Sequence, residues 1–531
     1  MRFRHVLPLA IGLPVRLLAQ TPTDSALPAD GGVPVVRAVE LHRRDIFDPE
    51  ERAWYARVAN ALHIQTRAGT VRRELLFQPG EPYDSARIAE SERNLRALGV
   101  FRRVVIDSVR TDSGLVVRVT TKDGWSTKAD WRFRSAGGDV SFTIGLVEDN
   151  LFGTASAAAV RYRKNPDRSS IALSLRRPRL FAGTVGLGLA YEDRSDGRLA
   201  LVALEQPFFA LTSKSRFRLE WEDQDLRVLR FFQGESEARD TVTRRYTLVR
   251  GSYARALRAS ADGYLRLGVL GQVRRDDYLP EGSGLDFPRT VTGAIGPYIA
   301  WNRASFLVAR GVAGFAREED VDLGITVRLG LLAAPKAFGY ERDGIGPFGY
   351  VRVGTRTPGG FGYLEALGSG IYNTAGLDSG TVQLAATAVL QPTSSQAAIL
   401  HAEGGWRRQP PPGQEFDLGL GVGPRAFGDH AFTGDRSVFA SAEYRLTLLD
   451  DFLGLVGLGI AGFVEHGGAW YAGSPRRLGW DAGMGIRLGA TRSTDTEALR
   501  FDLARRFAND VEAAGWVVTV GKGFLFSPLG P

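Results

Sequence analysis

The sequence predicts a mainly β protein in which a transmembrane antiparallel β-barrel follows one small α+β module. Apolar residues alternate with small or charged residues from Gly124 to Phe526, a pattern typical of strands that face lipid on one side and a lumen on the other. No segment after the N-terminus approaches the ~20 apolar residues that a membrane-spanning helix needs. A chain that crosses a membrane with strands must close them into a barrel, because lipid cannot satisfy an open sheet edge.

Composition excludes several kinds of chemistry. The 531 residues include no cysteine, so disulfides, thiolate metal sites and cysteine nucleophiles are ruled out. The net charge is +8, and of the 67 basic residues six are lysines and 61 are arginines. The arginines are spread along strand-like segments, without the basic stripe or module of a nucleic-acid-binding protein, so no nucleic-acid partner is expected.

The N-terminus resembles a secretory signal. A basic start is followed by the mostly apolar segment Val6–Ala19, so residues 1–20 are predicted to be a signal peptide that is cleaved after Ala19 or Gln20. The alternative is a disordered N-terminal tail. Residues 21–34, rich in Pro, Ala, Asp and Gly, are predicted to be a linker.

Residues 35–123 have a mixed α and β pattern. The predicted elements are, in order, a strand at 35–41, a helix at 50–63, an extended segment at 71–77, a helix at 85–98 and a hairpin of strands at 101–109 and 115–120. Asp84 can cap the second helix and Gly99 can end it. These elements make a compact α+β module.

The barrel strands show two distinct faces. In the segment 140–147, Phe142, Ile144 and Leu146 share one face, and in 484–488 Met484 and Ile486 oppose Arg487. A soluble sandwich or propeller is the alternative, but aromatic residues recur near strand ends, as membrane interfaces require. Counting alternating segments allows 16 to about 20 strands.

Sequence motifs for catalysis or cofactor binding are weak. The segment Gly457–Gly462 matches a dinucleotide-binding glycine pattern, but it lies among strands and no helix follows to bind a phosphate. The six histidines show no metal-ligand spacing, and no Ser/His/Asp or paired-carboxylate set converges. We therefore expect no enzyme activity, no cofactor and no metal; a hydrolase built from scattered residues is the alternative.

Several motifs stand in a characteristic order along the chain. They are Phe77–Pro82 (FQPGEP), Glu92–Phe101 (ERNLRALGVF), Glu148–Gly153 (EDNLFG), Gly423–Gly428 (GPRAFG), Glu443–Arg445 (EYR), Phe463–Gly467 (FVEHG) and Thr519–Phe526 (TVGKGFLF). This order resembles the BamA/TamA-type outer-membrane assembly factor superfamily, in which POTRA modules precede a surface-antigen-type barrel. The resemblance implies one POTRA module at 35–123, a barrel at 124–526 with 16 strands, and a short tail at 527–531.

The resemblance also implies a loop that folds into the lumen. Its tip consists of Arg425, Ala426, Phe427 and Gly428, with alanine where the family usually has glycine. The strand after the loop carries Glu443, Tyr444 and Arg445. In the family the tip arginine pairs with an acidic strand residue, here Glu465, which alternation independently places on the lumen side. A charged tip inside a lumen needs a fixed counter-charge, whereas the alternative is two unrelated charges.

The end of the chain resembles the β-signal of outer-membrane proteins. Its residues are Thr519, Gly521, Phe524 and Phe526. Lys522 has the same parity as the two aromatic residues, so its side chain would have to reach an interface. Porins share this signal, which therefore indicates location rather than function.

The resemblance implies a barrel in the bacterial outer membrane, with its N-terminal module in the periplasm. Such a barrel assembles, inserts or translocates proteins or lipids by adding a strand at its seam, without nucleotide or ion. The expected partners are outer-membrane lipids, unfolded outer-membrane or secreted clients, and a periplasmic or inner-membrane protein bound by the module. The alternatives are a POTRA-bearing secretion transporter, an anion-selective pore, or a structural surface antigen.

Overall fold

The computed structural model describes residues 34–522 apart from gaps at 52, 112–113, 137–138, 181–183, 208–212, 232–237, 239, 261, 281–289, 313, 316–317, 420–421, 494–497 and 508–509. The predicted signal peptide, all of the predicted linker except residue 34, and the predicted tail lie outside the described residues.

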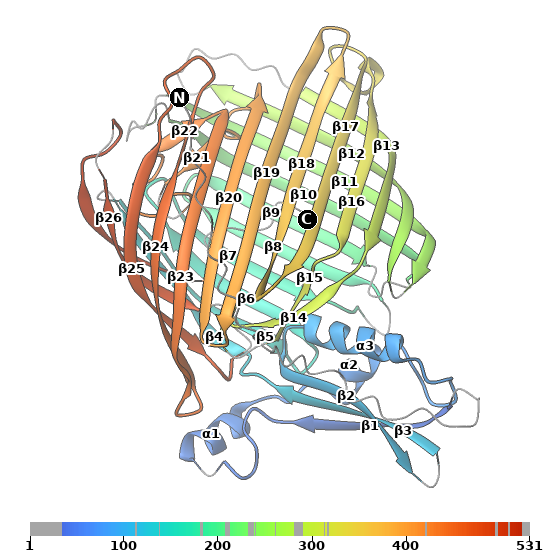
Figure 1. Cartoon of the computed structure of the whole chain (residues 1–531). Coiled ribbons are helices and arrows are strands. Elements are labelled where there is room, and N and C mark those ends of the chain that lie inside the picture. Colours follow the sequence, from blue (N-terminus) through green and yellow to red (C-terminus); the bar gives the residue numbers. More distant parts are fainter. Residues whose placement is uncertain are drawn as a thin grey trace, which may run out of the picture.

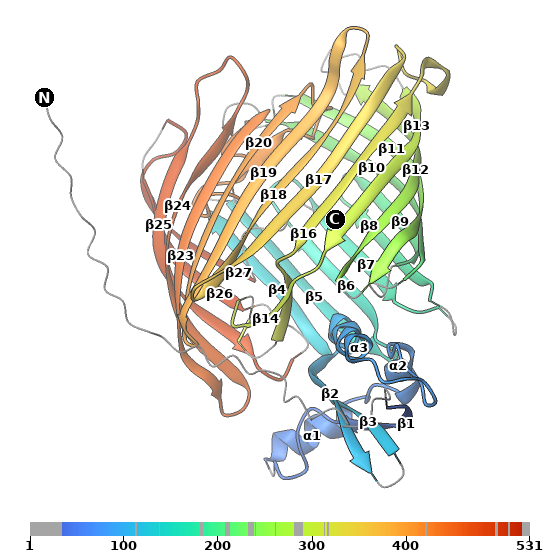
Figure 2. The ribbon, with the colours of Figure 1, turned by 45° about the vertical axis from the view of Figure 1, so that its right-hand side comes forward.

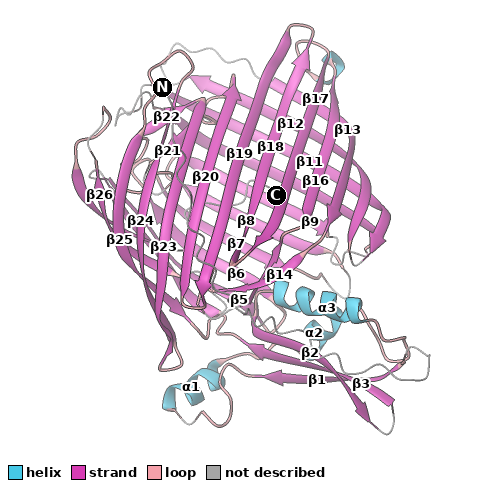
Figure 3. Ribbon diagram, in the orientation of Figure 1, coloured by secondary structure: helices cyan, strands magenta, loops and turns pink. Residues whose placement is uncertain are grey.

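The main body is a closed antiparallel β-barrel, with 20 strands in the described part of the chain (Figures 1 and 3). Ten strands are β4 (Thr127–Ala136), β5 (Asp139–Leu151), β6 (Ser156–Lys164), β7 (Ser169–Arg177), β8 (Gly186–Arg194), β9 (Gly197–Gln206), β10 (Ser215–Arg230), β11 (Asp240–Ser260), β12 (Gly263–Pro280) and β13 (Thr290–Arg303). Ten more are β16 (Ile325–Ala334), β17 (Gly344–Thr357), β18 (Gly360–Asn373), β19 (Gly376–Thr393), β20 (Gln396–Arg408), β23 (Arg436–Phe452), β24 (Val456–Trp470), β25 (Gly479–Ala490), β26 (Leu499–Arg506) and β27 (Gly515–Lys522).

The expectation of 16 strands is wrong. Two-residue turns such as 195–196 and 374–375 divide alternating runs into separate strands. Each strand from β4 to β9 pairs with its own neighbours on both sides, so none of them merges with the next. The number of strands depends on where pairing closes the sheet, which a resemblance between short motifs does not determine.

Burial follows the two predicted faces of the strands. Ile144 is 61% exposed and Met484 is 71% exposed on the outer surface, where lipid would cover them. Arg487 and Asp502, on the opposite faces of their strands, are each only 2% exposed. The period-two pattern therefore corresponds to an apolar outer face and a polar, filled lumen.

The N-terminal module, residues 34–123, packs at one end of the barrel, called here the module end; the opposite end is called the far end (Figure 2). Its elements are β1 (Val36–Arg44), α1 (Trp54–Leu62), α2 (Ala68–Arg73), α3 (Ser85–Ala97), β2 (Phe101–Thr111) and β3 (Gly114–Asp123). The sheet order is β1-β3-β2, with β1 parallel and β2 antiparallel to β3. The Asp84 carboxylate accepts the first free N–H groups of α3, as the sequence predicts.

One element of the module differs from the sequence-based expectation. The segment at 71–77 was expected to be extended, but its start belongs to α2. Val71 is fully buried in the module core, and Thr70 donates its hydroxyl to the backbone oxygen of Gly153 in the barrel. Packing on both sides thus overrides the preference of β-branched residues for strands. None of the described helices is long and apolar enough to cross a membrane.

The turn after β5 joins the module to the barrel. Asn150, 2% exposed, accepts the N–H of Ala155 and donates to the Thr66 hydroxyl at 2.9 Å. Gly153 has a φ of +70°, and a Cβ there would lie 2.7 Å from the backbone oxygen of Gln65. Ala155 is fully buried in the module core. The motif at 148–153 is therefore a docking turn for the module.

Candidate functional site: an arginine and carboxylate network in the lumen

The loop between β20 and β23, residues 409–435, folds into the barrel at its far end. It contains a two-stranded sheet of β21 (Phe416–Leu418) and β22 (Phe432–Gly434). Phe427 and Phe432 are fully buried, with ring centroids 5.0 Å apart. Gly479 on β25 leaves room for the Phe427 ring, because a Cβ at that position would overlap it. The apolar side of the loop therefore holds its tip against the barrel wall.

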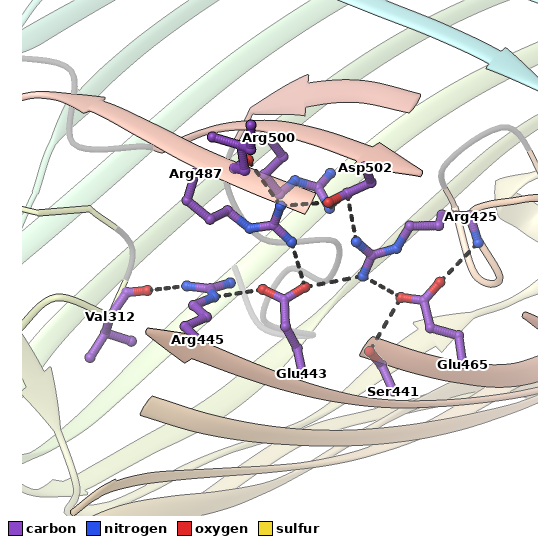
Figure 4. A network of polar contacts seen from close by, with 10 residues as sticks. Val312, Arg425, Ser441, Glu443, Arg445, Glu465, Arg487, Arg500 and Asp502 are labelled. Atoms are coloured by element: carbon purple, nitrogen blue, oxygen red, sulfur yellow. Dashed lines mark hydrogen bonds and ion pairs between the residues drawn. The ribbon is translucent and has the colours of Figure 1, made fainter. Parts of the chain in front are cut away.

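Arg425 projects from the loop tip into a set of carboxylates on the wall (Figure 4). Its Nη2 lies 2.7 Å from Glu465 Oε1 on β24 and 3.2 Å from Glu443 Oε2 on β23, and its Nη1 lies 2.7 Å from Asp502 Oδ2 on β26. The guanidinium is 3.6 Å from the ring centroid of Phe463. Arg425 is 1% exposed, so the structure brings together the two residues that the sequence paired, Arg425 and Glu465.

Further arginines extend this network toward the module end. Arg487 Nη2 donates to Glu443 Oε2 at 3.1 Å, and Arg487 also pairs with Asp502. Arg445 Nε donates to Glu443 Oε1 at 2.6 Å. Glu443 thus links three guanidiniums, and we call the set Arg425, Glu443, Arg445, Glu465, Arg487 and Asp502 the lumen network. Its charges alternate, which offsets the large cost of burying each ion alone.

The backbone of the loop tip is held by carboxylates as well. The N–H of Arg425 donates to Glu465 at 2.9 Å, that of Ala426 donates to Asp481 at 2.9 Å, and that of Gly428 donates to Glu512 at 2.7 Å. Hydrogen bonds from N–H groups to charged oxygens are stronger than those between neutral groups. Ala426 is fully buried, so a methyl group fits where the family usually has glycine.

The remaining predicted site residues fall in different places. Tyr444 is 48% exposed on the outer face and so does not join Glu443 and Arg445 in the lumen. Thr519 lies opposite Asp502 in the β26–β27 register. Gly521 accommodates Arg500, because a Cβ at this position would lie 3.0 Å from Arg500 Nη2. Phe524 and Phe526 lie outside the described residues.

Sequence reasoning did not connect Arg487, Asp481 or Asp502 to the loop tip. Alternation already placed Arg487 and Asp502 on the lumen face of their strands. The missing information was strand register: Asp481 lies opposite Glu465, and Gly485 lies opposite Asp502. A charged residue on the lumen face of each of several successive strands is the signal that could have suggested a shared partner.

The first and last barrel strands, β4 and β27, meet at a seam that closes the barrel. In the described residues β27 pairs with β4 only at Thr519↔Arg134 and Val520↔Phe133. The neighbouring pair of strands is continuous, from Leu499↔Lys522 to Arg506↔Gly515. Residues 523–526, which follow β27, lie outside the described residues, so these two residue pairs are the ladder that the described part of the seam shows.

A second polar cluster ties the loop to the far end of the barrel wall. His430 Nε2 lies 3.1 Å from Asp167 in the β6–β7 turn, and Nδ1 hydrogen-bonds Asp417 on β21. Burial alone would lower the pKa of His430, but the hydrogen bonds to Asp167 and Asp417 raise it to about 10. The stabilisation of the loop by protonated His430 is therefore fully present below pH 6.5, the ordinary pKa of histidine. It is lost as the pH rises through about 10, the pKa of His430 in the folded chain.

Asp167, Asp429 and His430 are a set in the described residues that could hold a metal ion, since one ligand atom from each lies within 4.8 Å of the others. Histidine spacing did not reveal this set, because its members come from different loops. In the structure His430 instead donates to carboxylates.

We predict that His430→Gln loosens the loop. The variant loses the imidazolium charge, and a hydrogen bond to a charged group contributes about 1.5–3 kcal/mol. We expect cleavage of loop 409–435 by added protease to become ~10-fold faster or more. The control is His42→Gln on the exposed surface of the module, which should cleave like the unaltered chain. Equal loop cleavage in the His430→Gln and His42→Gln variants would show that His430 does not hold the loop.

Comparison with known proteins agrees with this architecture. The POTRA family model, described as a surface antigen variable number repeat, matches residues 63–122. The outer membrane protein assembly factor BamA of Neisseria meningitidis is 29% identical over 159 residues, which cover 28% of this chain and 20% of that protein. BamA of Neorickettsia risticii is 28% identical over 142 residues, which cover 25% of this chain and 19% of that protein.

The chain thus spans about a fifth of the length of the curated relatives it matches. The crystal structure of BamA from Haemophilus ducreyi lacking POTRA domains 1–3 aligns with 93% of this chain and 85% of that one, at 12% identity and a TM-score of 0.39. The match of the POTRA family model to the module, the closed antiparallel barrel and the sequence similarity to BamA over about a quarter of the chain together make this chain similar to BamA/TamA-type POTRA-plus-barrel proteins of the outer membrane.

Proposed function

We propose that this protein inserts or translocates other proteins at the outer membrane by adding their strands to its seam. The observation that carries the proposal is the short ladder between β4 and β27 in the described residues, two residue pairs against eight between β26 and β27 and ten between β4 and β5. Opening of this short ladder would expose a strand edge, and an incoming strand that pairs with that edge satisfies its backbone before it meets lipid. The reaction is non-covalent, and the driving force is the gain of hydrogen bonds and apolar burial.

In this proposal the module lies in the periplasm and receives clients or partner proteins. Its sheet order leaves β1 and β2 as edge strands, which can accept an extended segment. Residues 42–44 at the end of β1 are exposed. The docking turn at 148–153 holds the module against β5, close in sequence to the strand that forms one side of the seam.

The lumen network holds the other side of the seam in this proposal. Asp502 on β26 is bound by Arg425 and Arg487, and β26 pairs along the whole described length of β27. A rigid β26 keeps β27 in position while the ladder between β27 and β4 opens. Arg425 is therefore expected to matter through positioning, without contact with a client.

The test is insertion of an unfolded barrel protein into liposomes that contain the purified chain. We expect folding of the client, read as its altered mobility on unheated gels, to be faster than in empty liposomes. Liposomes with an unrelated porin are the control for bilayer disturbance. Steady conductance across the bilayer without faster client folding would overturn the proposal.

A second candidate function is passage of anionic solutes or of a secreted protein through the lumen. Its support is a wall of arginines stacked on aromatic rings: Arg266 lies 3.4 Å from the ring centroid of Tyr264, and Arg328 lies 4.7 Å from that of Tyr298. Guanidiniums lining a pore favour anions. A reversal potential that indicates anion selectivity in planar bilayers would favour this candidate.

A further inference from the structure

A hairpin at the module end of the barrel belongs to neither the module nor the wall. It connects β13 to β16 and consists of β14 (Phe306–Arg310) and β15 (Glu318–Asp322), which pair with each other as a separate two-stranded sheet. Asp322 holds its base by accepting the N–H groups of Ser305 and Gly324. Figure 1 shows β14 and β15 between the barrel and α3.

The hairpin packs into the lumen. Ala309, Val312 and Leu323 are buried against lumen-facing residues of three wall strands. Those wall residues are Phe361 on β18, Val389 on β19 and Ile399 on β20. Together they form an apolar cluster inside the barrel, so the hairpin covers apolar surface that water would otherwise reach.

The hairpin also contacts the strands β23–β25, which follow β18–β20 in the barrel wall. Phe315 lies over Gly457 and Gly489, where a Cβ would overlap its ring, and over Gly459, where a Cβ would lie 3.4 Å from it. The backbone oxygen of Val312 accepts a hydrogen bond from Arg445 of the lumen network at 2.7 Å (Figure 4). The hairpin therefore covers the lumen side of six consecutive strands at the module end, from β18–β20 to β23–β25.

Helix α3 of the module holds the hairpin from outside. Arg96 Nε and Nη2 donate to the two carboxylate oxygens of Asp320 at 2.7 and 3.1 Å. The guanidinium of Arg93 lies 4.5 Å from the ring centroid of Phe306. Both contacts join the module directly to the hairpin, so a movement of α3 would act on the hairpin.

We propose that this hairpin is a plug that covers the β18–β25 side of the lumen and narrows its module-end mouth, and that α3 is its latch. Displacement of the module, such as by a bound partner, breaks the Arg96 and Arg93 contacts and frees the hairpin to leave the mouth. The proposal does not depend on client insertion, because such a plug would narrow the lumen equally in a transporter.

The experiment measures access to Val389, which lies beneath the hairpin and is 2% exposed. The chain has no cysteine, so Val389→Cys supplies a single thiol. Its labelling by a charged, water-soluble maleimide is followed in the reconstituted full chain. We expect slow labelling of the Val389→Cys variant. Labelling should become about tenfold faster when Asp320→Asn and Phe306→Ala are added to remove the contacts with α3, because the loss of a charged hydrogen bond shifts an equilibrium by about that factor.

Two further variants make the result specific. Phe315→Ala weakens the hairpin from the barrel side and should also speed labelling, whereas Val308→Ala, at a hairpin position that is 50% exposed, should leave the rate unchanged. Altered mobility on unheated gels checks that each variant keeps its barrel. The proposal that the hairpin is a plug would be overturned by fast labelling of the variant that carries Val389→Cys alone. It would also be overturned if labelling stayed equally slow after Asp320→Asn and Phe306→Ala, or after Phe315→Ala.

Discussion

Replacing Arg425 with alanine is expected to abolish the acceleration of client insertion. The substitution removes a guanidinium that pairs with Glu465, Asp502 and Glu443, and leaves these carboxylates buried without it. Breaking a buried ion pair by removing one partner costs about 3–5 kcal/mol. The loop tip is expected to leave the lumen, because the carboxylates gain more from water than from the remaining contacts.

The measurement compares insertion rates of the unaltered chain and Arg425→Ala in matched liposomes. Arg425→Lys should recover part of the activity, since it keeps the charge but cannot reach several carboxylates with one planar group. Arg408→Ala, an exposed arginine at the end of β20, is the control for loss of one positive charge. If Arg425→Ala inserts clients as fast as Arg408→Ala, the lumen network does not support the seam.

Locking the seam with a disulfide is expected to stop insertion reversibly. Phe133 and Val520 lie opposite each other in the β4–β27 register, and the chain has no other cysteine to compete. Cβ atoms of directly opposed residues lie ~4.5–5.5 Å apart, close enough for a disulfide after a small shift. The oxidised Phe133→Cys/Val520→Cys variant should insert clients at the rate of empty liposomes, and reduction should restore the rate.

A matched crosslink between two other barrel strands distinguishes an effect of locking the seam from an effect of stiffening the barrel in general. Leu503 and Val518 lie opposite each other in the β26–β27 register, both exposed on the outer face. Oxidised Leu503→Cys/Val518→Cys joins strands that are already fully paired, so insertion should continue. Continued insertion by the locked seam variant would rule out strand addition between β4 and β27.

Local sequence patterns predicted those features of the structure that depend on one strand or one helix alone. The two faces of each strand follow from period-two alternation, and the start of α3 follows from Asp84, because side-chain direction and helix capping depend on a few adjacent residues. The lumen position of Glu465 was predictable for the same reason. The pairing of Arg425 with Glu465 required the family resemblance in addition.

Only the tertiary structure decided the properties that join distant segments. The 20 strands, in place of 16, result from where β27 meets β4, and the helical form of α2 results from packing against the docking turn. The convergence of Asp502 and Arg487 on Arg425 depends on register across several strands, and the hairpin at 306–322 meets α3 across more than two hundred residues of chain. Alternation within one strand specifies which way a side chain points, but which side chains then meet depends on the closure of the whole barrel.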